Sequence, residues 1–259
     1  MVRPCTGYHG VSAGVSGSES YALPTTPRGL PSADIMSTSY WRGAAEDEAM
    51  QDEHRFVWTA MLDTIDVDLA GTRVLDVGCN RGGFLRLLAD DCGIKEGFGY
   101  DPAAGAIEDA RRLAGTRPLR FEAAAAPPAA WSGFDVAFSH EVLYLLDDLP
   151  AHATAIFRTL KPGGVYYAVM GVHAASPLMA AWHAENVEEM SLPALYDLDQ
   201  VAARFCDAGF EVAASRLWVR FIPIAARHLN EGRLLDWLDY YYNQKVLLRF
   251  SRPASAARN

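Results

Sequence analysis

The sequence predicts an α/β fold with a doubly wound, mostly parallel sheet of seven strands. Two observations support this prediction. Short apolar runs alternate with segments of helical periodicity along most of the chain, and the first run breaks into a glycine-rich turn. Such alternation implies parallel strands joined by helices that cover both faces of the sheet. The length of 259 residues is enough for one large domain with a substantial core.

The expected strands are short runs rich in β-branched and aromatic residues. In chain order they cover residues 74–77, 98–100, 119–122, 135–139, 165–170, 210–219 and 246–250. Helices are expected before and between them, at about 46–65, 84–88, 104–113, 149–160 and 198–208. The last strand is expected to run antiparallel, because residues 236–244 leave only a short return before it.

The domain organisation is read from changes in composition. Residues 1–35 are rich in Gly, Ser, Pro and Thr, which predicts a disordered or loosely packed extension. Residues 36–259 then form a single domain. Two segments exceed what the sheet needs, at about 171–197 and 222–244, and they are predicted to be helical lid inserts near the ligand-binding edge of the sheet.

Composition excludes several classes of function. The net charge of −9 argues against nucleic acid as a partner, since phosphate binding requires clustered Lys and Arg. No apolar run approaches the roughly 18–20 residues of a membrane span. The four cysteines show no metal-binding or disulfide spacing, which favours the reducing cytoplasm.

The run from Val74 to Gly83 carries the most information. An apolar strand ends in Asp76-Val77-Gly78-Cys79-Asn80-Arg81-Gly82, a turn that lets a ligand approach the backbone. Donors at the start of the next helix then face a polar group. A carboxylate at Asp76 would repel a pyrophosphate, so the turn suits a neutral or cationic ligand.

This turn resembles the first motif of class I S-adenosylmethionine-dependent methyltransferases. Three further stretches match in order: Asp101 after the second strand, residues 134–143 around the fourth, and Lys161-Pro162-Gly163-Gly164 before the fifth. The likeness spans about residues 72–219. It implies a Rossmann-like fold and S-adenosylmethionine as cofactor, with S-adenosylhomocysteine as product.

The resemblance also implies roles for individual residues. Asp76 would face the methionine ammonium, Asp101 the ribose hydroxyls, and the backbone carbonyl at Ser139 the methionine end. A segment near the N-terminus would fold over the sulfonium, using aromatic side chains. The complete set of implied cofactor residues is Tyr40, Trp41, Asp76, Gly78, Asn80, Gly82, Asp101, Pro102 and Ser139.

Two positions depart from the family pattern. Asn80 replaces the middle glycine of the turn, and Asn is the non-glycine residue that best tolerates positive φ, so the turn is expected to survive. Residues 123–126 are alanines where many relatives carry an aspartate that reads adenine. Glu122 and backbone groups are the alternatives for that contact.

The main hypothesis is methyl transfer to oxygen or nitrogen of a small-molecule acceptor, in particular a specialised metabolite. His140 and His173 follow strands four and five and are the candidate general bases. Tyr144, Trp182 and Tyr241 are the candidate acceptor contacts, with plain packing of the inserts as the alternative. No metal is expected, because His173, His183 and Glu185 match no ligand spacing.

Two rival functions stay open at this stage. The spacing of Gly78, Gly82 and Gly83 partly imitates a dinucleotide turn, which would make the chain an NAD(P)-dependent oxidoreductase. Asp76 and Asn80 argue against that reading. The other rival is a methyltransferase-like binding protein without catalysis. A homodimer is compatible with the sequence, which does not specify the oligomeric state.

Overall fold

A computed structural model describes residues 44–190, 192–222, 224 and 234–254. Its centre is one seven-stranded sheet with the strand order β3-β2-β1-β4-β5-β7-β6. The strands are β1 (Arg73–Val77), β2 (Glu96–Asp101), β3 (Leu119–Ala123), β4 (Phe134–His140), β5 (Leu160–Gly171), β6 (Glu211–Arg216) and β7 (Lys245–Ser251). The main helices are α1 (Ala44–Thr64), α2 (Gly83–Asp91), α3 (Ala104–Ala114), α4 (Leu149–Thr159), α5 (Pro177–Met190), α6 (Leu198–Asp207) and α8 (Leu234–Asp239).

The direction of the strands confirms the predicted doubly wound sheet. β1 pairs in parallel with β2 and β4, β2 with β3, and β4 with β5. β7 inserts antiparallel between β5 and β6. A π-helical turn, Tyr240–Gln244, leads directly into β7. The first residue of β7, Lys245, pairs with Gly171 at the carboxyl end of β5, so β7 runs back along β5.

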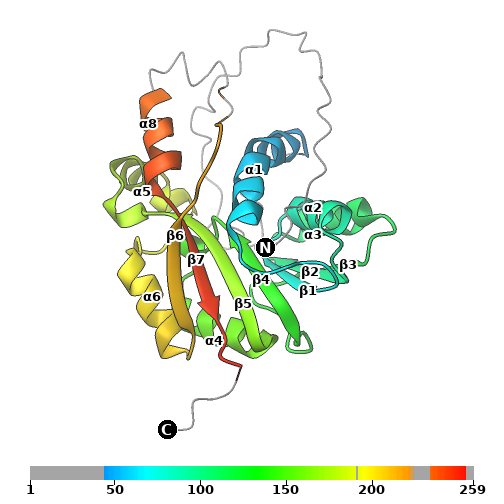
Figure 1. The fold of residues 1–259 in the computed structure, drawn as a ribbon. Coiled ribbons are helices and arrows are strands. Elements are labelled where there is room, and N and C mark those ends of the chain that lie inside the picture. The colour runs from blue at the N-terminus through cyan, green and yellow to red at the C-terminus, as the bar shows by residue number, and fades with distance from the viewer. Residues whose placement is uncertain (1–43, 191, 223, 225–233, 255–259) are drawn as a thin grey trace.

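Helices cover both faces of the sheet, and each layer has its own apolar core. One face packs against α1, α2 and α3 through side chains such as Val74, Phe138 and Tyr167. The other packs against α4 and α6 through Leu75, Tyr166 and their neighbours. In Figure 1, α1, α5 and α8 gather beyond the upper end of the sheet, where β5 ends and β7 begins. The carboxyl end of β5 therefore lies on the side of the sheet where α5 and α8 are found.

Two predicted boundaries differ from the structure. Residues 161–164 were expected to form a turn before the fifth strand, yet they belong to β5. Gly163 has φ +83 there, and the pairing of β4 with β5 shifts register between Phe134 and Val136. The glycines thus make an irregular strand start. The sixth strand is also shorter than expected, because its pairing with β7 ends at Arg216.

Both predicted inserts contain helices. The first holds a short 3-10 turn, His173–Ala175, followed by α5. The second holds α8 and the π-helical turn before β7, while residues 223 and 225–233 lie outside the described part. The predicted extension, residues 1–35, also lies outside it. None of the described helices is long and apolar enough to cross a membrane.

A buried histidine in the α4 layer predicts acid sensitivity. His152 is buried, its Nε2 lies 3.4 Å from the Tyr166 hydroxyl, and burial lowers its pKa from 6.5 to about 4. Between these values the unfolded chain binds the proton and the folded chain does not, so stability is full above pH 6.5 and falls toward pH 4. We expect a loss of about 3 kcal/mol from this group, measured by urea unfolding at several pH values. His152→Phe is the control, and an unchanged pH slope in that variant would contradict the assignment.

Candidate functional site

The turn between β1 and α2 adopts the backbone that the sequence predicted. Gly78, Asn80 and Gly82 all have positive φ, at +67, +46 and +70. Asn80 therefore occupies, as predicted, a left-handed conformation that most residues with side chains avoid. The Gly82 backbone accepts from the N–H of Arg86, which starts the first turn of α2. The turn thus ends with the donors of a helix N-terminus facing the edge of the sheet.

Packing leaves no room for a side chain at Gly78 or Gly82. A Cβ on Gly78 would lie 2.6 Å from the Val142 side chain, and one on Gly82 would lie 2.5 Å from the Phe121 ring. Real Cβ atoms do not approach that closely. The turn is therefore pressed onto the neighbouring strands, and its glycines have a structural reason in addition to any role toward a ligand.

We expect Gly82→Ala to destabilise the protein more than Gly71→Ala. Gly71 has a similar φ of +72 but nothing within 4 Å of an added Cβ. Its alanine variant should lose only the roughly 1–2 kcal/mol that a left-handed backbone costs a residue with a side chain. Overpacking against Phe121 should add about 1–3 kcal/mol at Gly82. Thermal unfolding of both variants measures the difference, and equal losses would show that Phe121 moves aside without cost.

Two carboxylates, Asp76 and Asp101, lie near this turn and influence each other electrostatically. Asp76 is buried with 5% of its surface exposed, and no hydrogen bond or ion pair reaches its carboxylate from the described residues. Burial, together with the nearby charge of Asp101, raises the pKa of Asp76 well above its ordinary value. An unpaired buried acid of this kind is stabilised by a cation. The site therefore favours a ligand with a positive group beside Asp76.

Asp101 ends β2 and ties the turn to the next loop. Its Oδ2 accepts from the Asn80 N–H at 3.0 Å, and its Oδ1 accepts from the Ala103 N–H at 2.9 Å. Pro102 between them is exposed. A carboxylate has about four lone-pair positions, and these two bonds use one position on each oxygen. Glu122, the alternative adenine contact, forms an exposed ion pair with Arg111 at 3.3 Å.

Ser139 lies at the carboxyl end of β4 and is almost completely buried. Its hydroxyl is 2.6 Å from the Tyr166 hydroxyl, within the α4 side of the sheet. The side chain is thus committed to the core, whereas the backbone at Ser139 lies at the edge where β4 ends. This agrees with a role for the carbonyl and not for the hydroxyl.

His140, the last residue of β4, points to the opposite face and contacts α1. Its Nδ1 accepts from the Trp58 indole N–H at 3.3 Å, and its ring meets the His54 ring edge-on at 4.7 Å. Burial is the main cause that lowers the pKa of His140 well below 6.5, and burial also lowers the pKa of His54 to about 4. Both imidazoles are therefore neutral at pH 7.

A buried ion pair completes this cluster, and sequence reasoning missed half of it. Lys245 Nζ lies 2.6 Å from Glu141 Oε1, with 4% and 15% of the two side chains exposed. The ammonium also lies over the rings of Tyr240 and Tyr241, at 4.9 Å and 5.4 Å from their centroids. Lys245 begins β7, so in the sequence it reads as an ordinary strand entry. We refer to His54, Trp58, His140, Glu141, Lys245, Tyr240 and Tyr241 as the β4–β7 cluster.

The remaining predicted site residues are placed only in part. Tyr40 and Trp41 lie outside the described residues. His173 and Trp182 have a described backbone, in the 3-10 turn after β5 and in α5, but no described side chain. Tyr144 lies in a 3-10 turn three residues after Glu141. Tyr241 packs edge-on against Phe56 of α1 at 5.1 Å, which brings it into the β4–β7 cluster.

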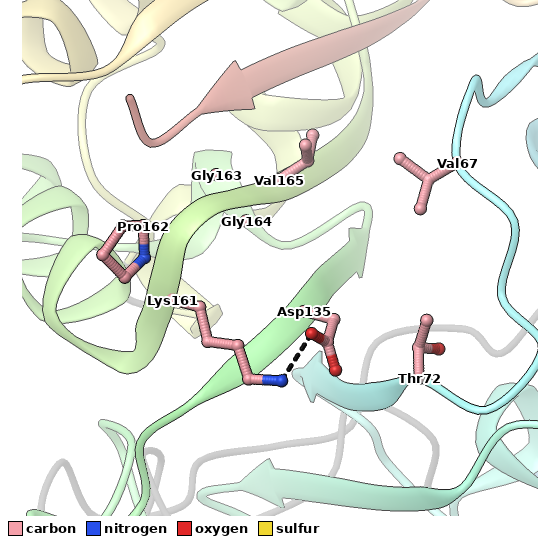
Figure 2. A pocket seen from close by; sticks show the side chains of 8 residues that line it. All are labelled: Val67, Thr72, Asp135, Lys161, Pro162, Gly163, Gly164 and Val165. Atoms are coloured by element: carbon pink, nitrogen blue, oxygen red, sulfur yellow. Dashed lines mark hydrogen bonds and ion pairs between the residues drawn. The ribbon is translucent and has the colours of Figure 1, made fainter. Parts of the chain in front are cut away.

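Two cavities lie away from this edge. One of about 290 Å³ is at the amino ends of β4 and β5, where Lys161 pairs with Asp135 at 2.6 Å (Figure 2). Asp135 also accepts from the Arg73 N–H at 2.9 Å, so its carboxylate is occupied by protein partners. The other, about 200 Å³, lies between α1 and α2 and includes Trp58 in its wall. Neither contains Asp76 or Asp101 in its lining.

Within the described ranges no three His, Cys, Asp or Glu side chains are grouped so as to hold a metal ion. His183, one of the residues weighed for such a cluster, has its Nε2 2.7 Å from the Pro193 carbonyl oxygen. That nitrogen therefore donates to the backbone and has a structural task.

Comparison with known proteins gives the family. Residues 41–215 match a family model described as a methyltransferase domain. Malonyl-[acyl-carrier protein] O-methyltransferase of Enterobacter lignolyticus is 27% identical over 196 residues, which cover 71% of this chain and 76% of that relative. Among solved structures, a Haloferax volcanii protein described as a methyltransferase, in complex with the Trm112 methyltransferase activator, has a TM-score of 0.70 at 25% identity. The aligned part covers 82% of this chain and 96% of the Haloferax volcanii chain.

A more distant structure shares the fold. A Haemonchus contortus N-methyltransferase, solved with phosphomonomethylethanolamine and S-adenosylhomocysteine, has a TM-score of 0.62 at 18% identity, covering 81% of this chain and 58% of that one. The matched family model spans more than half of the chain, including both carboxylates of the turn. This match decides against the NAD(P)-dependent oxidoreductase that the sequence left open. The chain belongs to the class I S-adenosylmethionine-dependent methyltransferases, and S-adenosylmethionine is its methyl donor.

Proposed function

We propose that this methyltransferase transfers the methyl group of S-adenosylmethionine to oxygen or nitrogen of a small-molecule acceptor, in particular a specialised metabolite. The observation that carries the proposal is the β4–β7 cluster. It places neutral imidazoles, a paired ammonium and aromatic rings together at the carboxyl ends of the strands, where ligands bind in open α/β sheets. Such a mixed, largely buried surface suits a small, partly apolar molecule.

The cofactor is assigned to the turn beside this cluster. Asp76 binds the methionine ammonium, because its buried carboxylate has no protein partner among the described residues. Asp101 and the loop at Pro102 bind the ribose, the backbone of Gly78, Asn80 and Gly82 approaches the methionine end, and the Ser139 carbonyl accepts from the ammonium. Tyr40 and Trp41 remain proposals from the sequence.

The acceptor is assigned to the side of α1, α5 and β7. The position of Tyr241 in the β4–β7 cluster supports this assignment. The position of Tyr144, shortly after β4, supports it as well. Trp182 and His173 belong to the insert that follows β5, as expected for groups that close over an acceptor. His140 and His173 stay the candidate catalytic histidines.

The chain's contribution to the reaction is alignment and exclusion of water. S-adenosylmethionine supplies a methyl group on a positively charged sulfur. The protein has to hold the acceptor atom in line with that methyl group, and alignment alone can supply about 7–11 kcal/mol of the barrier. The named helices and rings shield the site, which strengthens every electrostatic contact inside it.

The test uses the full-length protein and methyl-labelled S-adenosylmethionine. Calorimetry should show binding of the cofactor, and incubation with a metabolite extract from the source organism should give a labelled small molecule. Cofactor binding without any labelled product would favour the binding-protein alternative. Absence of cofactor binding would overturn the assignment of the turn.

A further inference from the structure

Glu141, the residue directly after β4, has a backbone conformation that its side chain disfavours. Its φ is +58, in the left-handed region. Among the described residues other than glycine, only Asn80 also has a positive φ, and asparagine tolerates that region well. For a glutamate the left-handed conformation is disfavoured by a factor of roughly 5–30. Such a conformation persists only where the surrounding structure fixes it, and it is frequent at functional sites.

Contacts from two other strands hold Glu141 in this conformation. Its backbone N–H donates to the Val169 carbonyl of β5 at 2.9 Å. Its carboxylate lies 2.6 Å from the ammonium of Lys245, in a buried ion pair. Lys245 is fixed in turn, because its backbone carbonyl accepts from the Leu217 N–H at 3.0 Å. The first residue of β7 therefore holds the chain just after β4 through one ion pair.

The left-handed corner at Glu141 places the next residue against the cofactor turn. Val142 is half-buried, and its methyl groups lie so close to Gly78 that a Cβ added there would be 2.6 Å from Val142 Cγ2. Gly78 is also held by β2, because its N–H donates to the Tyr100 carbonyl at 2.9 Å. A different φ at Glu141 would move Val142 relative to Gly78. A continuous path of contacts thus runs from Lys245 through Glu141 and Val142 to the turn.

We propose that Glu141 is a positioning residue for the cofactor. Its ion pair with Lys245 holds the corner after β4, and the corner keeps Val142 against Gly78, in the conformation of the turn that receives the methionine end of S-adenosylmethionine. This role rests on the proposed placement of the methionine end at the turn. Without the ion pair the corner relaxes in most molecules. Cofactor binding must then restore it, and the affinity falls by the fraction of molecules that keep the corner.

The experiment compares two double variants of the full-length protein that both lack the ion pair. Lys245→Met/Glu141→Gln and Lys245→Met/Glu141→Gly each remove both charges, so neither variant keeps a buried charge without its partner. They differ at the corner, because glycine adopts positive φ about as readily as negative φ and glutamine does not. We expect the dissociation constant for S-adenosylmethionine, measured by calorimetry, to rise about 5–30-fold in the glutamine variant. In the glycine variant it should stay within about 3-fold of the wild type.

Val142→Ala tests the other end of the same path. This variant keeps the ion pair but removes the methyl groups that lie against Gly78, and we expect its dissociation constant for S-adenosylmethionine to rise about 3-fold or more. Val212→Ala is the matched control. Val212 is also a partly buried valine packed against the same core cluster, but it lies in β6, so its variant should bind the cofactor as the wild type does. Thermal unfolding shows that each variant is folded at the temperature of the measurement.

Wild-type affinity in the glutamine double variant would overturn the positioning role, because the corner would then not matter to the cofactor. Equal weakening in both double variants would also overturn it, since the loss would come from the missing charges and not from the backbone. If the double variants do not fold, the two valine variants decide: equal affinities in Val142→Ala and Val212→Ala contradict the path to Gly78. A wild-type protein that does not bind S-adenosylmethionine contradicts the placement of the cofactor itself, so the two failures are distinguishable.

Discussion

Asp76→Asn is expected to make the free protein more stable and its binding of S-adenosylmethionine weaker. Burial and the charge of Asp101 raise the pKa of Asp76 well above its unfolded value. At pH 7 the carboxyl ionises without cost in the unfolded chain. In the folded chain its ionised form is desolvated and repelled by Asp101, so the ionised group destabilises the fold. An amide at the same place removes that cost but also removes the partner of the methionine ammonium.

We expect the variant to gain roughly 1–3 kcal/mol in the free energy of unfolding, measured by urea denaturation without ligand. Its dissociation constant for S-adenosylmethionine should rise about 10–100-fold by calorimetry, since hydrogen bonds to charged groups contribute roughly 1.5–3 kcal/mol.

Asp135→Asn is the matched control. Asp135 is already paired with Lys161 and the Arg73 N–H at the other end of the sheet. Its variant should lose a little stability and bind the cofactor normally. An Asp76→Asn protein with unchanged affinity would contradict the placement of the ammonium, and one with lower stability would contradict an unpaired buried charge.

Lys245→Met is expected to destabilise the protein by about 3–5 kcal/mol. The substitution keeps the length and apolar stem of the side chain but leaves Glu141 beside the buried His54 and His140 without its cation. Removing one partner of a buried pair leaves an uncompensated charge, and this costs far more than the pair itself contributes. Adding Glu141→Gln to Lys245→Met should therefore recover more than half of the loss.

Lys161→Met provides a control, because its ion pair has the same nitrogen–oxygen distance but is more exposed. The Lys161–Asp135 pair is also 2.6 Å long, but 49% of the lysine side chain is exposed, against 4% for Lys245. Exposed pairs contribute about 0–1 kcal/mol. Urea denaturation of the three variants tests both expectations. Similar losses in the two single lysine variants would show that burial of the Lys245–Glu141 pair is not what makes it strong.

Local sequence signals were sufficient for the fold. Apolar runs of three to ten residues, the glycines at 78 and 82, and the short return before β7 each act over a few neighbouring residues, so they can be read from the chain alone. The same holds for Asn80, whose positive φ follows from its own side chain. The start of β5 was misread, because Gly163 and Gly164, which normally would make a turn, form hydrogen bonds with the distant Arg252, directly after β7.

The proposed cofactor residues come from the order of motifs along the chain, with Asp76 near the end of β1 and Asp101 at the end of β2. The β4–β7 cluster follows a different rule. Trp58 and His140 are 82 residues apart, and Glu141 and Lys245 are 104 residues apart. No periodicity or turn preference links such pairs, because their meeting depends on how α1 packs and on where β7 enters the sheet. The sequence by itself therefore determined the sheet and indicated S-adenosylmethionine as the methyl donor. Only the tertiary structure decided which nitrogen of His140 carries its proton and which charge balances Glu141.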